Sequence, residues 1–205
     1  ENKLTLAQVT EIFLTTESYL FRRTMCDLPT NALNKIFLML HREIVRYDGT
    51  EDDYVEKFKY ALLSKKERAR FPDDVEFKVA FEERPVYLMN SKNKIYLLER
   101  FENFGTSEDK DVYRHCDDGT YSIEHIMPQH LTPVWQKELG DDYEQIHEEW
   151  LHRMANLTLT AYNSKYSNSS FTEKKTMQNG FDDSGIRMNT WITKKNKWTL
   201  AELEE

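Results

Sequence analysis

The chain has 205 residues, of which 39% are hydrophobic and 31% charged, and its formal net charge is −8. This length predicts one domain, or one domain with a small appendage, and the hydrophobic share is sufficient for a core. No apolar run approaches the ~20 residues that a membrane-spanning helix needs, and the N-terminal segment lacks the basic start of a secretory signal. The negative charge weighs against autonomous DNA binding, which favours a basic face.

The charge is unevenly distributed, and the cysteines are few. Acidic residues dominate from Tyr121 to Trp150, whereas basic residues dominate from Leu151 to Trp198. The two cysteines, Cys26 and Cys116, form neither a disulfide framework nor a zinc motif, so we expect a cytoplasmic protein. A capping-box pattern opens a helix just before the sequence stops, which suggests a fragment of a longer protein.

The first hundred residues have the apolar spacing of helices, and their stripes are interpreted as core. The sequence 105–111 is the best linker candidate, which predicts a helical lead-in over residues 1–105 and a second subdomain over 106–205, packed on it. The first expected helix begins with a capping box between Thr5 and Gln8, and its apolar stripe is Val9, Ile12, Phe13, Leu20 and Phe21. Two further helices are expected from Leu33 to Val45, capped by Thr30 or Asn31, and from Tyr54 to Leu63, started by Thr50 with Asp53. The remaining expected helices are a short one started by Ser64 with Glu67, one from Val75 to Phe81 and one from Lys94 to Phe104.

The residues after the linker candidate have a different pattern of apolar and polar residues. Residues 121–126 and 156–160 are short and β-like, and an amphipathic helix is expected between them over 141–154. A further helix is expected after the polar segment 163–170, capped by Asn168 or Ser170. Two strands and a helix bury little surface alone. The predicted fold is therefore mainly α, with a strand–strand–helix unit near the C-terminus packed on a helical body.

The first candidate site is the sequence Glu124-His125-Ile126-Met127-Pro128. An imidazole titrates near neutrality and suits a general base acting on water, and a carboxylate suits a hard cation. Strict strand alternation would point Glu124 and His125 to opposite faces, so a shared site requires a bend near Pro128. A histidine bonded to backbone at a strand end is the alternative interpretation.

Two later segments carry further candidates. Asn156 could hold a neighbouring loop with its amide, and Asn163 could offer an oxygen to a metal, although an asparagine taken alone more often serves as a turn or cap residue. The serine-rich start of the helix that contains Lys174 could cradle a phosphate or be an ordinary helix N-terminus. His147 and His152 are five residues apart and would diverge by roughly 140° on a helix, which disfavours a zinc protease.

Taken together, IEHIMPQ, MANLTLTAYN and SNSSFTEKK, in this order, resemble the HNH (His-Me finger) domain at the C-terminus of GmrSD-type restriction proteins. These are type IV, modification-dependent enzymes with an upstream nucleotide-hydrolysing ParB-like domain. Residues 22–26, 33–37 and 71–74 also resemble the helical lead-in of that family, so the resemblance covers most of the chain. It implies a ββα-metal motif.

The resemblance also implies roles for individual residues. Ala155 departs from the glycine that is usual before the central asparagine. The implied roles are a metal ligand for Glu124 and Asn163, the general base for His125, a loop brace for Asn156, a phosphate contact or leaving-group role for His152, and nucleic-acid binding for Asn168 and Lys174. Lys165, in the basic stretch after Leu151, is a further candidate for nucleic-acid binding.

The functional hypothesis is a metal-dependent endonuclease that acts on DNA, possibly modified phage DNA. Hard oxygen ligands favour Mg²⁺ or Mn²⁺ over Zn²⁺. The basic stretch after Leu151 would face the DNA backbone. Two alternatives stay open: a non-catalytic module that binds nucleic acid or a partner protein, and a ribonuclease that uses the same site.

Overall fold

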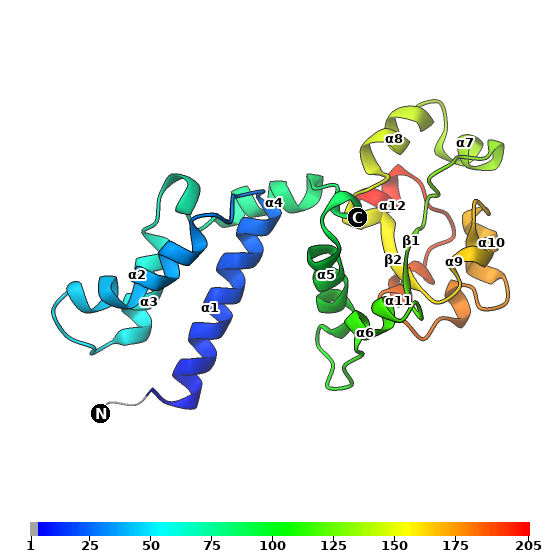
Figure 1. Cartoon of the computed structure of the whole chain (residues 1–205). Coiled ribbons are helices and arrows are strands. Elements are labelled where there is room, and N and C mark those ends of the chain that lie inside the picture. The colour runs from blue at the N-terminus through cyan, green and yellow to red at the C-terminus, as the bar shows by residue number, and fades with distance from the viewer. Residues whose placement is uncertain (1–3) are drawn as a thin grey trace. The chain divides into compact units, whose positions relative to one another are not determined.

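Helices dominate the chain, which confirms the mainly α class (Figure 1). The structure is a computed structural model that describes residues 4–205, and its chain divides into two compact units between Phe81 and Glu82. Among the described residues, no helix is both long enough and apolar enough to cross a membrane.

The N-terminal unit is a small helical assembly. Its core is formed by side chains from the first three helices, among them Tyr19, Ile44 and Leu62. The buried Arg23 donates to the carbonyl oxygens of Arg68, Arg70 and Pro29, which ties the following turns to this core. The elements are α1 (Leu6–Met25), α2 (Leu33–Arg46), α3 (Tyr54–Leu63), the 3-10 turn η1 (Glu67–Ala69) and α4 (Asp74–Glu83), which crosses the division.

The predicted N-terminal caps of the helices in this unit are only partly confirmed. The Thr5–Gln8 capping box is confirmed, because both reciprocal hydrogen bonds form. The expected caps of α2 are wrong, since Ala32 occupies that position without a side-chain bond. Thr50 does not cap α3 either, because its hydroxyl is bound among Asp48, Asp52 and Lys57. The hydroxyl of Thr50 was therefore unavailable as a cap, because the Asp48–Lys57 ion pair binds it.

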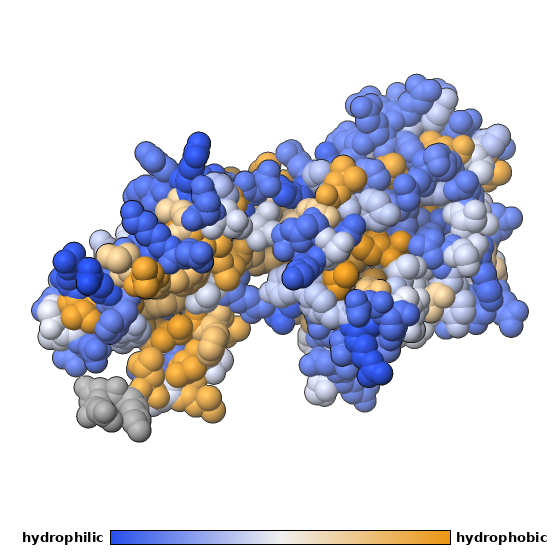
Figure 2. All heavy atoms as spheres, viewed as in Figure 1, coloured by the Kyte–Doolittle hydropathy of each residue, from blue (hydrophilic) through white to orange (hydrophobic). Residues whose placement is uncertain are grey.

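Part of the first predicted stripe is exposed. Figure 2 shows apolar atoms gathered along α1, where Leu6 is 83% exposed and Phe13 69% exposed. The interpretation of Phe13 as a core residue is wrong, whereas Val9, Ile12, Leu20 and Phe21 are half-buried. The stripe was judged by its spacing, and spacing does not reveal how wide a face neighbouring helices cover.

The C-terminal unit contains one antiparallel pair of strands surrounded by short helices. The strands pair with Glu124 opposite Thr158 and His125 opposite Leu157. All four residues of the second strand are buried, so both of its faces are covered. The elements are η2 (Val86–Leu88), α5 (Ser91–Asn103), α6 (Val112–Asp117), β1 (Ser122–His125), α7 (Pro133–Leu139), α8 (Tyr143–Trp150), η3 (Met154–Asn156), β2 (Leu157–Thr160), α9 (Asn163–Tyr166), α10 (Phe171–Thr176), η4 (Phe181–Asp183), α11 (Asn189–Ile192) and α12 (Leu200–Glu204).

The division between the units lies upstream of the 105/106 boundary that the linker composition predicted. Asn103 exchanges two hydrogen bonds of 2.8 Å with the backbone of Lys110, so the segment is a clasped loop. The buried Glu102 accepts from the backbone N–H groups of Arg187 and Met188 at 2.9 and 3.0 Å. Helix α5 therefore belongs with the C-terminal unit.

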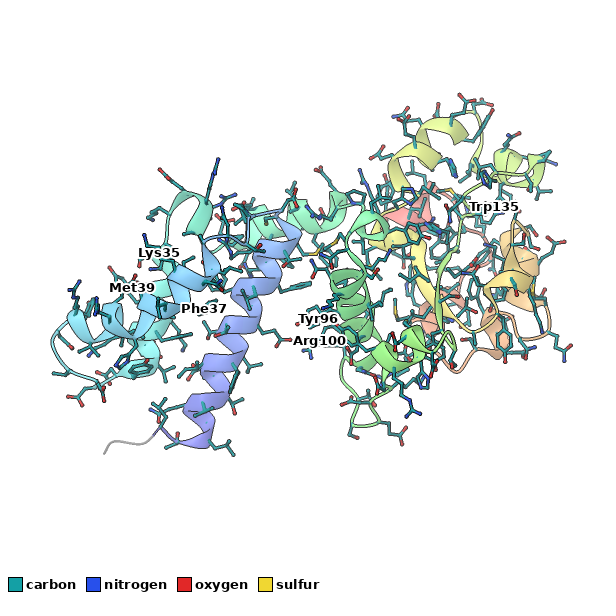
Figure 3. The ribbon with its side chains drawn as sticks, in the orientation of Figure 1. Lys35, Phe37, Met39, Tyr96, Arg100 and Trp135 are labelled. Carbon is teal, nitrogen blue, oxygen red and sulfur yellow. The ribbon has the colours of Figure 1, made fainter. Side chains whose placement is uncertain are left out.

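The main core of this unit is aromatic. Trp135, labelled in Figure 3, is completely buried, and its indole N–H donates to the carbonyl of Ser169 at 2.9 Å. Phe171, at the start of α10, stacks on Trp198 with ring centroids 5.5 Å apart. The capping box of α10 between Ser170 and Glu173 is confirmed. These contacts hold α10 in place, and α10 carries Lys174.

Candidate active site

The end of β1 borders a pocket that contains the central motif. Glu124 and His125 both line this pocket, although they are consecutive residues of a strand. The ammonium group of Lys174 donates to the carbonyl oxygens of His125 and Ile126 at 2.8 and 3.1 Å. Its bonds hold the chain where β1 ends, at the place where the sequence required a bend.

Glu124 and Lys174 form a buried ion pair. Their side chains are 2.5 Å apart and almost completely inaccessible to solvent. Burial raises the pKa of Glu124 to about 7, and the ammonium of Lys174 acts in the opposite direction. Burial also lowers the pKa of Lys174. The carboxyl group therefore has one cationic neighbour and still faces a pocket.

His125 is buried and paired with a second histidine. Its Nε2 lies 3.2 Å from Nδ1 of His152. Burial lowers the pKa of His125 to about 4, and the neighbouring His152 and Lys174 add to the effect. The pKa of His152 is lowered as well, first by burial. Both rings are thus neutral near pH 7, and a neutral imidazole can accept a proton.

Asn156 holds the chain that follows the motif. Its amide oxygen accepts from the N–H of Met127 at 2.7 Å, and its amide nitrogen donates to the carbonyls of Met127 and Leu151 at 2.9 and 3.1 Å. The residue is completely buried. Asn156 therefore connects the segment after His125 to the segment before β2.

The remaining asparagines lie on the far side of β2 in sequence. Asn163 begins α9 and lines the pocket, and its amide nitrogen donates to the carbonyl of Ile123 at 2.9 Å. This bond uses the amide donor and not the Oδ1 atom. Asn168 and Ser167 also line the pocket, and Ser167 has a φ of 44°, in a region that non-glycine residues rarely adopt.

The two lysines grouped as DNA-binding residues have different environments. Lys165 is exposed on α9, with its ammonium 5.1 Å from the ring centroid of Tyr162. Lys174 is completely buried, so the structure does not present it to a phosphate. The N-terminus of α10 also uses its own Ser170 and Glu173 as caps, which matches the ordinary-helix alternative.

Sequence reasoning missed several residues of the pocket. Tyr87, Gln129 and His130 line it together with the predicted residues. His130 follows the motif directly, so its position along the chain was a usable signal. Tyr87 comes from a turn far upstream and has no recognisable pattern around it. The complete lining is Tyr87, Ile123, Glu124, His125, Pro128, Gln129, His130, Asn163, Ser167 and Asn168.

The pocket offers few side chains that could hold a divalent cation. Within residues 4–205 no group of three or more His, Cys, Asp or Glu side chains is placed to hold a metal. The pocket does combine a carboxylate from Glu124 with an amide from Asn163, and Mg²⁺ commonly keeps several waters and takes few protein ligands. The set therefore fits a hydrated Mg²⁺ or Mn²⁺. His147 donates to the carbonyl of Pro128 and His152 contacts His125, so these histidines serve separate partners.

The class of protein follows from a comparison with known families. Residues 71–205 match the sequence model of the GmrSD restriction endonucleases, C-terminal domain, and this range includes the whole pocket. The chain is therefore a nuclease domain of the restriction-enzyme class. It belongs to the family of C-terminal domains of GmrSD restriction endonucleases, as the three motifs predicted. No curated protein matches the chain.

Proposed function

We propose that the chain is a divalent-metal-dependent endonuclease of the HNH (His-Me finger) type that hydrolyses DNA phosphodiester bonds. One observation carries this proposal: Glu124 and His125 at the end of β1 and Asn163 at the start of α9 line one pocket. A base and two hard oxygen donors are what the hydrolysis of a phosphodiester needs around the scissile bond.

His125 is the proposed general base. Its neutral imidazole accepts a proton from the attacking water. A pKa of about 4 makes it a weak base in the free protein. The negative charge of a phosphate that enters the pocket acts to raise the pKa of His125, which favours proton transfer when the substrate is bound.

His152 is proposed to orient the ring of His125, and Asn156 is proposed to hold the loop that follows it. The contact with His152 occupies Nε2 of His125, so Nδ1 is the ring nitrogen proposed to accept the proton, and Nε2 then donates to His152. His152 is also proposed to contact the phosphate or the leaving group. Asn156 acts as a positioning residue, because its bonds to Met127 hold the chain that follows His125.

Glu124 and Asn163 are the proposed holders of Mg²⁺ or Mn²⁺. Their oxygen atoms suit a hard cation, and Zn²⁺ is disfavoured. When bound, the cation supplies Lewis-acid stabilisation of charge on the phosphate. The Glu124 oxygen bonded to Lys174 stays with that ammonium group, because a carboxylate has further lone pairs to offer.

The substrate and setting follow from the family. We propose DNA as substrate, possibly modified phage DNA, and a cytoplasmic role in phage defence. An upstream nucleotide-hydrolysing ParB-like domain of the same protein is the proposed partner. The net charge of −8 gives this chain little attraction for DNA on its own, so a second domain would supply part of the binding.

Plasmid cleavage with Mg²⁺ or Mn²⁺ tests the proposal. His125→Ala is expected to lower the rate by at least about 100-fold, and a chelator is expected to abolish cleavage. His41→Ala is the matched control, since His41 is an exposed histidine in the N-terminal unit. If His125→Ala cleaves as fast as the parent, the assignment of the base is wrong.

Metal binding and substrate choice separate the alternatives. Mn²⁺ binding, measured by titration calorimetry, should weaken in Glu124→Gln and in Asn163→Ala. A chain that neither cleaves nor binds Mn²⁺ would be a non-catalytic module. Faster cleavage of RNA than of DNA under identical conditions would identify a ribonuclease with the same site.

A further inference from the structure

Tyr87 contacts both histidines of the site. Its ring centroid lies 4.3 Å from that of His125, in an edge arrangement with an interplanar angle of 65°. The same ring stacks on His152 at 5.3 Å, with an interplanar angle of 11°. Tyr87 belongs to η2, ahead of α5 and outside the strand–strand–helix motif. One aromatic ring therefore touches both members of the imidazole pair.

The backbone of Tyr87 is fixed from two sides. Its N–H donates to the carbonyl of His152 at 3.1 Å, and its carbonyl accepts from the ammonium of Lys94 at 3.0 Å. That ammonium lies 4.6 Å from the centroid of the tyrosine ring. The preceding Val86 is completely buried and anchors the turn. The ring is thus held by the turn and cannot easily swing away.

The hydrogen bond between the two imidazoles does not by itself fix the orientation of either ring. A single contact between Nε2 and Nδ1 sets a distance but lets each ring rotate about its side-chain axis. The edge contact and the stacked contact with Tyr87 restrict these rotations, because the two rings meet it at different angles. Aromatic contacts of this kind have preferred geometries and contribute about 0.5–1.5 kcal/mol each.

We propose that Tyr87 is a positioning residue that holds the His125–His152 pair in the orientation needed to activate the nucleophile. This inference rests on the proposed function of the site. Tyr87 acts through its ring and its backbone, because every contact described for it uses one or the other. A misplaced base loses rate while substrate binding is retained, since orientation contributes to the reaction step.

The test compares variants in plasmid cleavage and in stability. Tyr87→Leu is expected to lower kcat by roughly 10- to 100-fold with little change in KM, whereas Tyr87→Phe retains most of the rate. Lys94→Met keeps the ring and removes one anchor, and a smaller loss is expected. Tyr121→Leu is the matched control, because Tyr121 packs on His115 at 4.8 Å and that pair lies outside the pocket lining.

A second readout does not depend on cleavage. In NMR spectra recorded without added metal, Tyr87→Leu should shift the imidazole signals of His125 and His152 and leave that of His115 in place. If Tyr87→Leu and Tyr121→Leu lose rate equally, or if the two imidazole signals do not move, the inference is overturned. A large loss in Tyr87→Phe would assign the role to the hydroxyl and overturn it as well. If His125→Ala is active, the proposed function itself fails.

Discussion

Two buried carboxylates in the C-terminal unit lie in contrasting surroundings. Glu102 accepts from Lys110 at 2.7 Å and from two backbone N–H groups, so both of its oxygens are occupied. Within residues 4–205, Glu124 accepts from Lys174 alone and borders the pocket. Burial by itself therefore does not mark a functional carboxylate. A buried carboxylate with acceptor capacity left over, beside a pocket, does mark a candidate.

The largest stability change should come from the partner of Glu124. Lys174→Met leaves a buried carboxylate without its cation and should destabilise the fold by about 3–5 kcal/mol. Urea unfolding gives the free energy of unfolding of each variant. Adding Glu124→Gln to Lys174→Met should recover at least about 1 kcal/mol, because the uncompensated charge is then removed. Simple additivity of the two single changes would contradict a coupled pair.

Glu102 should prove purely structural. Glu102→Ala leaves two backbone donors unpaired and should cost about 3 kcal/mol of stability. The fraction that remains folded should cleave DNA at the parental rate. Glu124→Gln should differ in cleavage, with a large loss of rate in the folded protein, and it should also lower stability because Lys174 stays buried without its carboxylate. A loss of kcat in folded Glu102→Ala would remove the distinction between the two carboxylates.

The buried His125 beside the pocket should make the stability of the fold depend on pH. His125 has a pKa near 4 in the folded chain and about 6.5 when unfolded, so the unfolded state takes up the proton first as pH falls. From pH 7 to pH 5 this should cost the parent about 2 kcal/mol more than His125→Gln. Unfolding free energies of both proteins at each pH give the difference. An unchanged difference would show that His125 is not shielded from solvent.

The smallest effect is expected at the exposed lysine. Lys165→Ala should change stability by less than about 0.5 kcal/mol, because the side chain is exposed. If Lys165 contacts phosphate, the salt dependence of DNA binding should weaken by roughly one unit of slope. Fluorescence anisotropy at several salt concentrations measures this slope, and an unchanged slope would exclude the contact.

The sequence predicted those features of the fold that depend on residues close together in the chain. The capping boxes at Thr5, Ser170 and Thr199 all form, because each involves residues three apart. The bounds of α3 match the sequence expectation of Tyr54–Leu63. The short helices α6, α7 and α11 were missed, since pieces of four to seven residues are held by tertiary packing and carry little periodicity of their own.

The candidate site was predictable in part for the same reason. The motif around His125 and the asparagines indicated which residues to bring together, and the structure places Glu124, His125 and Asn163 around one pocket. The burial of Lys174 was not predictable, because its contact with Glu124 joins residues fifty apart. The contacts of Tyr87 with His125 and His152 could not be predicted either, because these residues are far apart in the sequence and no local motif surrounds Tyr87.

The long connection between β1 and β2 has a consequence for the order of folding. Residues 126–156 separate the paired strands and contain α7 and α8, so no tight turn can start the pairing. Closing such a connection costs entropy before the strand contacts repay it. Lys174, which holds the end of β1, is synthesised later still. A partly made chain that ends before α10 therefore lacks the ammonium group that holds the end of β1, so the pocket is completed only after Lys174 has been added.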